Sequence, residues 1–229
     1  MKRGIVFLLF FLLMASIASA HQPRVAFGDN IAGNITRINN PEVSQAFYGI
    51  MQGMPDHYKI SSDSNFTLYL NILVPDFGDK DFSVAVFSAS ESIHPETLLV
   101  LDGTNFTWTP YYEDFAGDNY FKGPEVRRRM PAGVYEIKVY SPDNIGKYSL
   151  AVGEKEEFPL SEMFNAVVTL PVIKTDFFGK PWISAYTNRI GIYLLSALLI
   201  IGVLIVIAVM LLIRLFRSLK SKKETVIVK

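Results

Sequence analysis

A long apolar stretch near the C-terminus, residues 190–213, constrains this chain more than any other feature. It runs for 24 residues without a charged side chain and lies between Arg189 and Arg214. As an α-helix it would reach roughly 36 Å, enough to cross a hydrocarbon core of about 30 Å. A helix buried inside a soluble protein rarely stays apolar on every face for that length. The stretch therefore predicts one transmembrane helix at residues 189–213.

A second, shorter apolar stretch has the pattern of a signal peptide. Lys2 and Arg3 precede an apolar core at residues 5–14, and Ala18-Ser19-Ala20 supplies the small residues that a signal peptidase accepts. We expect residues 1–20 to be removed, so that the mature chain begins at His21. An uncleaved N-terminal anchor is the alternative.

Charge is divided by position along the chain. Residues 21–188 contain 21 acidic and 13 basic side chains, a net charge of −8, whereas residues 214–229 contain six basic and one acidic, a net charge of +5. Basic residues beside a membrane span tend to stay in the cytoplasm. We therefore expect a single-pass plasma-membrane protein with an extracellular or periplasmic body and a basic cytoplasmic tail, 214–229. Its partners would include the lipid bilayer but no nucleic acid.

The body, residues 21–157, has the period-two pattern of β-strands. Apolar and more polar residues alternate in a long run at 66–74, and shorter apolar or alternating runs follow at 82–86, 97–101, 134–140 and 148–152, separated by Gly, Pro, Asp and Asn turns. Residues 21–40 read as irregular. The pattern predicts a mainly-β ectodomain, an antiparallel, jelly-roll-like β-sandwich. Because the chain has no cysteine, its core must hold this domain without disulfides.

The segment between the sandwich and the span, residues 158–188, predicts a short amphipathic helix that ends at Pro171. Apolar side chains fall at helical spacing at Leu160, Met163, Phe164, Val167 and Val168. This helix would either pack on the sandwich or lie at the membrane interface. Behind it we expect an aromatic collar close to the bilayer surface, formed by Phe177, Phe178, Trp182, Tyr186 and Tyr193.

Short motifs in the body resemble bacterial pre-peptidase C-terminal domains over roughly residues 44–153. The first half of the resemblance is Asp56-His57-Tyr58-Lys59-Ile60, then the run at 66–74, then Asp79-Lys80-Asp81-Phe82. The second is Pro131-Ala132-Gly133-Val134-Tyr135 followed by Gly146-Lys147-Tyr148-Ser149-Leu150. The chain departs from the family between residues 90 and 129, where an aromatic-rich insertion replaces a compact turn region. The resemblance implies a β-sandwich accessory module that binds or spaces, without chemistry of its own.

Two surface features predict a binding site. Trp108, Tyr111 and Tyr112 lie among carboxylates, an arrangement that can stack on sugar faces and hydrogen-bond hydroxyls, although such rings also pack across loops as satellite clusters. Arg127, Arg128 and Arg129 form a dense positive run that could meet an anionic partner; the alternative is a solvated loop before the Pro131 turn.

Two weaker features concern metals. A mature N-terminal His21 could chelate copper if His57 or His94 completed the site, or it could simply begin a flexible arm. Asp76, Asp79 and Asp81 could supply oxygen ligands to Ca²⁺, or they could form a solvated acidic turn. Beyond possible Cu or Ca we expect no cofactor.

Three Asn-x-Thr triplets, at Asn34, Asn65 and Asn105, would allow glycosylation. Hydrolase and nucleotide-binding motifs are absent from the sequence. We therefore expect a non-enzymatic surface protein whose sandwich binds a protein or polysaccharide, or serves as an accessory subunit of a membrane complex. The alternative is a copper-binding protein or oxidase that uses His21.

Overall fold

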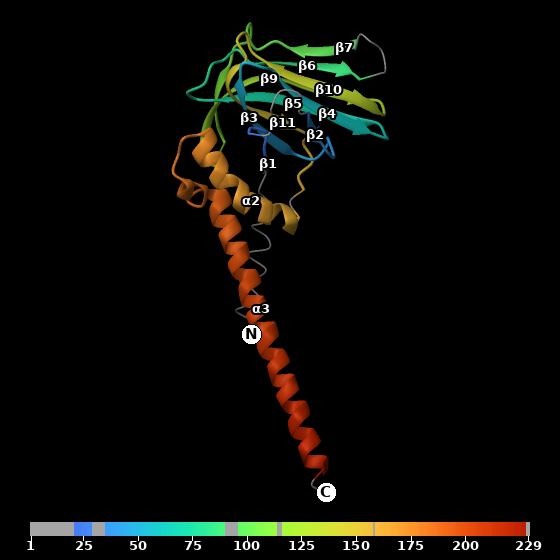
Figure 1. Cartoon of the computed structure of the whole chain (residues 1–229), viewed down its shortest axis with the longest axis vertical. Coiled ribbons are helices and arrows are strands. Elements are labelled where there is room, and N and C mark those ends of the chain that lie inside the picture. Colours follow the sequence, from blue (N-terminus) through green and yellow to red (C-terminus); the bar gives the residue numbers. More distant parts are fainter. Residues whose placement is uncertain (1–20, 29–34, 90–95, 114–115, 158, 228–229) are drawn as a thin grey trace.

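The computed structural model describes residues 21–28, 35–89, 96–113, 116–157 and 159–227. The predicted signal peptide, Asn34 and His94 lie outside these residues. The described chain forms two β-sheets packed face to face, with a helical segment beneath them and one long helix projecting away (Figure 1). The prediction of a mainly-β sandwich followed by a C-terminal apolar helix is confirmed.

The first sheet has six strands and the second has five. In spatial order, the first sheet contains β1 (Gln22–Val25), β3 (Gln45–Gln52), β11 (Ile145–Val152), β5 (Phe66–Pro75), β9 (Asp118–Met130) and β8 (Thr109–Glu113). The second contains β2 (Thr36–Ile38), β4 (Asp56–Ser62), β10 (Gly133–Tyr140), β6 (Ser83–Ser88) and β7 (Glu96–Leu101).

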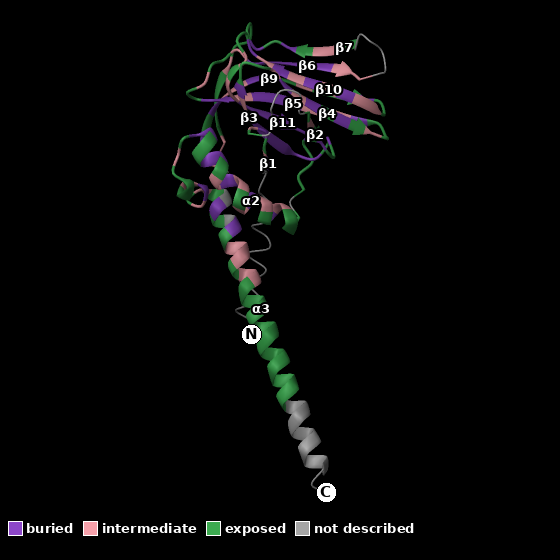
Figure 2. Cartoon of the chain, in the orientation of Figure 1, coloured by how far each residue is buried: buried purple, intermediate pink, exposed green. Residues whose placement is uncertain are grey.

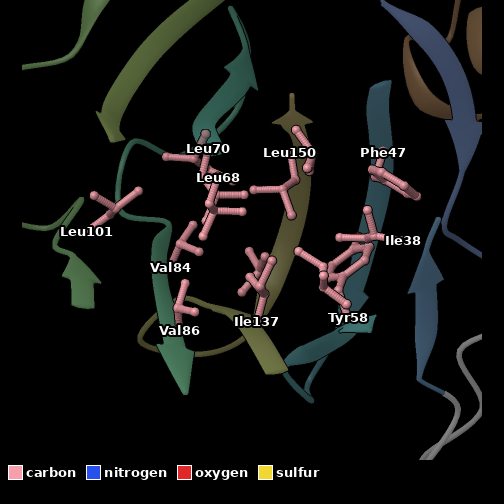
Figure 3. Close-up of a cluster of buried hydrophobic side chains, with 14 of the residues drawn as sticks. Ile38, Phe47, Tyr58, Leu68, Leu70, Val84, Val86, Leu101, Ile137 and Leu150 are labelled. Carbon is pink, nitrogen blue, oxygen red and sulfur yellow. The ribbon is translucent and has the colours of Figure 1, made fainter. Parts of the chain in front are cut away.

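The alternating residues of β5 explain why the sheets pack as they do. Every second side chain of a strand points to the same face, so Leu68, Leu70 and Ile72 all enter the space between the sheets, where they are fully buried. They meet the inward side chains of the second sheet, such as Val84 and Ile137 (Figure 3). Complete burial of each such side chain contributes about 1.5–3 kcal/mol, so this one face stabilises much of the domain.

A hydrogen-bonded pair of tyrosines crosses the core. The Tyr58 hydroxyl lies 2.6 Å from that of Tyr148, and Tyr148 donates to a carboxylate oxygen of Asp56 at 2.7 Å. Gly49 on β3 faces the Tyr148 ring, and a Cβ there would lie 2.3 Å from a ring carbon. The close approach therefore requires glycine at this position.

The sandwich differs from the predicted one at its edges and in one long strand. Residues 21–40 are not irregular throughout, because β1 pairs in parallel with β3, and β2 pairs in parallel with β4. These strands have four and three residues, too few to show a period. Likewise the predicted insertion at 90–129 contains β7, β8 and most of β9, whose 13 residues place the three arginines on a strand and not in a loop.

The helical segment consists of α2 (Leu160–Val172), the π-helical turn η2 (Ile173–Phe177) and the 3₁₀ turn η3 (Trp182–Ala185). The long helix that follows it is α3 (Arg189–Ile227). The helix predicted from residue 160 is present, but its predicted end at Pro171 is wrong. Pro171 has no N–H for the carbonyl of Val167, four residues earlier. The Tyr186 hydroxyl donates to that carbonyl at 2.7 Å instead, and the helix continues into η2.

The α3 helix contains the apolar stretch predicted from the sequence. Residues Leu194–Arg217 form a 24-residue segment with a mean hydropathy of 3.2, and no residue of its most apolar window is buried. Its length and composition are compatible with a single membrane crossing. The first turns of α3 pack against the rest of the protein, where Leu194 is buried with Met163, Ala166 and Leu170 of α2.

Candidate ligand groove and the base of the long apolar helix

A tyrosine-lined groove lies on the outer face of the first sheet. Its cavity volume is about 140 Å³, and α2 contributes Leu170 to its rim. We call it the tyrosine groove after four of the side chains that line it. Those four are Tyr48, Tyr69, Tyr111 and Tyr120; Asn71, Leu73, Glu113, Lys122 and His21 also line it.

The groove exists because outward positions of strands distant in sequence are brought side by side. The alternate apolar residues of β5 point into the core between the two sheets, so Tyr69, Asn71 and Leu73 must point to the outer face. Tyr111 on β8 lies opposite Tyr120 on β9, with ring centroids 6.5 Å apart. Three strands of the sheet therefore place aromatic and polar side chains on one face.

The hydroxyls of Tyr48, Tyr69 and Tyr120 in the groove remain protonated at neutral pH. Burial raises the pKa of Tyr48 and of Tyr120, whose hydroxyls lie 3.4 Å apart. Burial also raises the pKa of Tyr69, which donates to the carboxylate of Glu125 at 2.8 Å. Lys122 contacts the same carboxylate oxygen at 2.9 Å. Hydrogen bonds from Lys122 and Tyr69 lower the pKa of Glu125, so the groove edge offers fixed charges and neutral hydroxyls.

The other half of this outer face is covered by η2 and the residue after it. Ile173, Phe177 and Phe178 are buried against Tyr48, Tyr120 and Ala46. The Tyr48 ring meets the Phe177 ring edge-on at 5.1 Å. The expectation that Phe177 and Phe178 form a collar at the bilayer is therefore wrong, because both rings belong to the interface between the helical segment and the sheet.

A buried ion pair fixes η2 to the β8–β9 hairpin. The Lys174 ammonium lies 2.5 Å from Asp118 Oδ2, and the two side chains are 2% and 1% exposed. Lys180 reaches the other oxygen of Asp118 at 2.8 Å. Burial lowers the pKa of Lys174, and the hydrogen bond to Asp118 opposes that shift. Lys174 also donates to the carbonyl of Ala116 at 2.9 Å, so its charge is well compensated.

The hairpin also holds the start of α3. The Asn188 side-chain oxygen accepts a hydrogen bond from the backbone N–H of Gly191 at 2.8 Å, which is the geometry of a helix N-cap. Its amide nitrogen donates to the Ala116 carbonyl at 2.6 Å. The Asn188 side chain thus caps α3 and also joins it to the β8–β9 connection, whose Ala116 lines the groove.

The three predicted aromatic residues have different positions. Tyr111 lines the groove and is 41% exposed. Tyr112 is 56% exposed, but as the next residue of the strand it points to the opposite face of the sheet. Trp108 donates to the Gly103 carbonyl at 2.8 Å and packs against the core, so it is a structural residue of the loop before β8.

The predicted arginine cluster is divided between the two faces of β9. Arg127 contacts Glu154 at 2.9 Å, whereas Arg128 donates to the Leu98 carbonyl on β7 at 2.8 Å. Arg129 is exposed and lies opposite Thr67 in the sheet. Because successive strand residues alternate in direction, the three guanidinium groups do not form one anion-binding patch.

Among the described residues, the structure does not bring together the predicted metal ligands; His94 lies outside them. His21 lines the groove on the first sheet, whereas His57 lies on β4 of the second sheet and contacts Glu136 at 2.7 Å. In the described part of the chain, no three His, Asp or Glu side chains form a group that could hold a metal ion, and this includes Asp76, Asp79 and Asp81. Burial, followed by the neighbouring carboxylates of Asp79 and Asp143, raises the pKa of Asp81.

Two of the three glycosylation triplets can be placed. Asn65 is exposed in the β4–β5 turn, and its side-chain oxygen accepts a hydrogen bond from the backbone of Ala132. Asn105 is exposed after β7, and its amide donates to Asp102 at 2.7 Å. Exposure leaves both open to modification, which stays a prediction.

Sequence reasoning missed most of the groove and the whole base of α3. Tyr69 and Asn71 could have been found, because the alternation of residues 66–74 already assigns them to an outward face. Tyr48 and Tyr120 had no such signal. The contact between Asp118 and Lys174 spans 56 residues of sequence and that between Asn188 and Ala116 spans 72, and no local pattern marks either contact.

No protein-family model and no curated protein matches this chain. Among solved structures, it is similar to the pre-peptidase C-terminal domain of a Bacillus anthracis collagenase, with 13% identity and a TM-score of 0.35 over 54% of this chain and 98% of that one. A surface-associated copper-binding protein important in copper acquisition by Methylomicrobium album BG8 has 7% identity and a TM-score of 0.28, over 53% of this chain and 98% of that chain.

A third similar structure is a β-glucosidase from Paenibacillus barengoltzii, with 13% identity and a TM-score of 0.26, covering 58% of this chain and 13% of the enzyme. A pre-peptidase C-terminal domain is thus among the similar structures. These TM-scores are too low to carry an argument about function.

Proposed function

We propose that this chain is a non-enzymatic, single-pass membrane protein that binds a glycan in the tyrosine groove of its β-sandwich. The observation that supports the proposal best is the lining of the groove. Tyr111 presents a partly exposed ring there, beside the carboxylate of Glu113 and the ammonium of Lys122.

The side chains of the groove match the chemistry of a sugar. The apolar face of a pyranose ring packs on a tyrosine, which offers a large rigid surface at little cost in conformational entropy. Sugar hydroxyls both donate and accept hydrogen bonds, so they can satisfy carboxylates, ammonium groups and phenol hydroxyls together. Because the tyrosine hydroxyls stay neutral, they can act as donors and as acceptors.

The membrane part of the proposal follows from sequence and structure together. The apolar segment Leu194–Arg217 is long enough to span a bilayer. The net charge of −8 in residues 21–188 and of +5 in residues 214–229 favours a sandwich outside the cell and a tail in the cytoplasm. A cleaved signal peptide at residues 1–20 would direct that orientation. A protein built this way would hold its groove close to the cell surface.

A pair of neighbouring tyrosines provides a matched test. The full chain, reconstituted in phosphatidylcholine nanodiscs, would be applied to a glycan array and then titrated with the glycans retained. Tyr111→Ala should weaken binding about tenfold or more, the usual effect of removing an aromatic anchor. Tyr112→Ala removes an equally large ring from the opposite face and should leave affinity unchanged.

Three results would count against glycan binding. The array might retain nothing, both variants might bind as the unchanged chain does, or both might lose affinity equally. A parallel peptide array distinguishes the closest competitor: retention of peptides alone, sensitive to Tyr111→Ala, would assign the groove to a protein partner instead.

A further inference from the structure

The α2 helix carries an apolar stripe on the face turned away from the protein. Leu160, Phe164, Val168 and Val172 are 60%, 54%, 66% and 39% exposed, and they recur at every fourth residue. This spacing puts them along one side of the helix. Figure 2 shows exposed, intermediate and buried positions interspersed along α2. We call these four residues the α2 stripe.

The stripe is not needed to hold α2 in place. The opposite face of the helix supplies Met163, Ala166 and Leu170 to a buried cluster. The N-terminal end of α2 is held separately, because Glu162 contacts Arg24 on β1 at 2.7 Å. The outward face of a helix that is already held by these two contacts would ordinarily carry polar residues. Four exposed apolar residues at every fourth position there indicate a surface that meets an apolar environment.

The position of α2 identifies that environment. Its inner face packs on Leu194, which is the first residue of the apolar segment that could span a membrane. The stripe is therefore held beside the level at which that segment begins. Trp182 and Ile183, on η3, are also 57% and 50% exposed, and tryptophan favours the membrane–water interface. The helical segment therefore exposes further side chains that are suited to lipid.

We propose that the α2 stripe inserts into the interfacial region of the bilayer leaflet on the sandwich side. The occupant of this surface is lipid, recognised through apolar contact and not through charge. The stripe contains no basic residue, and the nearby Lys174 and Lys180 are turned toward Asp118. Binding should therefore be strong on neutral phosphatidylcholine and insensitive to salt, unlike a polybasic surface.

This inference rests on the proposed membrane anchoring of α3 and adds a second contact to it. With α3 as the only membrane contact, α3 and the sandwich could tilt together in the bilayer. An α2 stripe seated in the same leaflet gives a second support. Because η2 and α3 are both joined to the β8–β9 hairpin, that support would also fix the direction in which the tyrosine groove faces.

The absence of cysteine from the chain makes the test direct. Single cysteines at Phe164→Cys and Val168→Cys would carry an environment-sensitive NBD fluorophore in full-length protein reconstituted into phosphatidylcholine vesicles. Val100→Cys is the matched control, because Val100 is also an exposed valine, 51% exposed, but lies on β7 at the far side of the sandwich from α3 (Figure 1). Quenching would be measured with doxyl-labelled lipid and with aqueous iodide.

Labels at positions 164 and 168 should be quenched severalfold more by doxyl lipid than the label at position 100, and severalfold less by iodide. Equal access of iodide to all three labels would overturn the proposal. Protection of positions 164 and 168 from both quenchers would also overturn it, since protein would then cover the stripe. A chain that fails to incorporate into vesicles contradicts the anchoring by α3 itself, which separates failure of the proposed function from failure of this inference.

Discussion

The side-chain amide of Asn188 donates a 2.6 Å hydrogen bond to the carbonyl of Ala116, across 72 residues of sequence. Its oxygen caps α3 through the N–H of Gly191. The connection between β8 and β9 therefore holds the base of α3, while the two strands carry Tyr111 and Tyr120 of the groove. Groove and helix are parts of one rigid unit, which is a different arrangement from a domain on a flexible tether.

Replacing Asn188 with alanine should destabilise this junction by about 1–2 kcal/mol, the range for loss of a helix N-cap together with one hydrogen bond. Thermal unfolding of the full chain in detergent would measure the loss. Spin labels on a cysteine in β9 and another in α3 should report a broader distance distribution in Asn188→Ala. Asn188→Asp is the control, because it keeps the capping oxygen but has no N–H for Ala116. An intermediate effect is expected; unchanged unfolding in both variants would contradict the junction.

The pair formed by Asp118 and Lys174 should respond unequally to removal of either partner. Asp118→Asn leaves the buried Lys174 ammonium without its carboxylate, which costs about 3–5 kcal/mol. Lys174→Met should cost much less, because a methionine fills the space and Asp118 still contacts Lys180. Chemical denaturation of both variants would test this order. Equal or reversed losses would show that the buried charge is not what stabilises the contact.

The sequence predicts the parts of the fold whose pattern is local. Every second residue from Phe66 to Val74 is apolar, so β5 and its buried face could be predicted, as could the apolar length of α3. β9 could not be predicted from its pattern. Its register against β5 shifts between Asn71 and Leu73, and Arg128 occupies a position on its inward-facing side near the sheet edge. Both features interrupt the alternation of apolar and polar residues.

From the sequence, the candidate site could be predicted only where the alternation within one strand shows which of its residues point outward. Tyr69 falls in that group, but Tyr48 and Tyr120 meet across strands that are 72 residues apart. Residues 177 and 178 show that aromatic residue type alone is not enough to predict a collar at the bilayer surface. Phe177 and Phe178 have the expected residue type for an interfacial collar, yet they pack on tyrosines of the sheet because η2 returns to it.

Acid should loosen the N-terminal end of α2 through Glu162. The hydrogen bond from Arg24 lowers the pKa of this carboxyl below its ordinary value of 4.5. A carboxyl with a depressed folded-state pKa contributes its stability in full above the unfolded value, and that contribution is lost as the pH falls through the folded-state pKa. The difference in Tm between the unchanged chain and Glu162→Gln should therefore be constant near neutrality and vanish in acid.

The control for this acid effect is Glu96→Gln, which removes an exposed carboxylate on β7. Its Tm should follow that of the unchanged chain at every pH. A Glu162→Gln difference that persists undiminished in acid would mean that the carboxylate does not stabilise α2 through Arg24.

The hydroxyl of Tyr186 should stabilise the protein only because Pro171 lies within a helix. Pro171 leaves the Val167 carbonyl without its usual N–H, and Tyr186 donates to it at 2.7 Å. Tyr186→Phe should therefore cost about 1 kcal/mol, as expected for one hydrogen bond. In a chain that also carries Pro171→Ala, the new N–H can reach Val167, so the same Tyr186→Phe change should cost much less. Unfolding free energies of the four chains form a double-mutant cycle. A coupling free energy near zero would show that the two residues act independently and that another interaction stabilises α2 at Pro171.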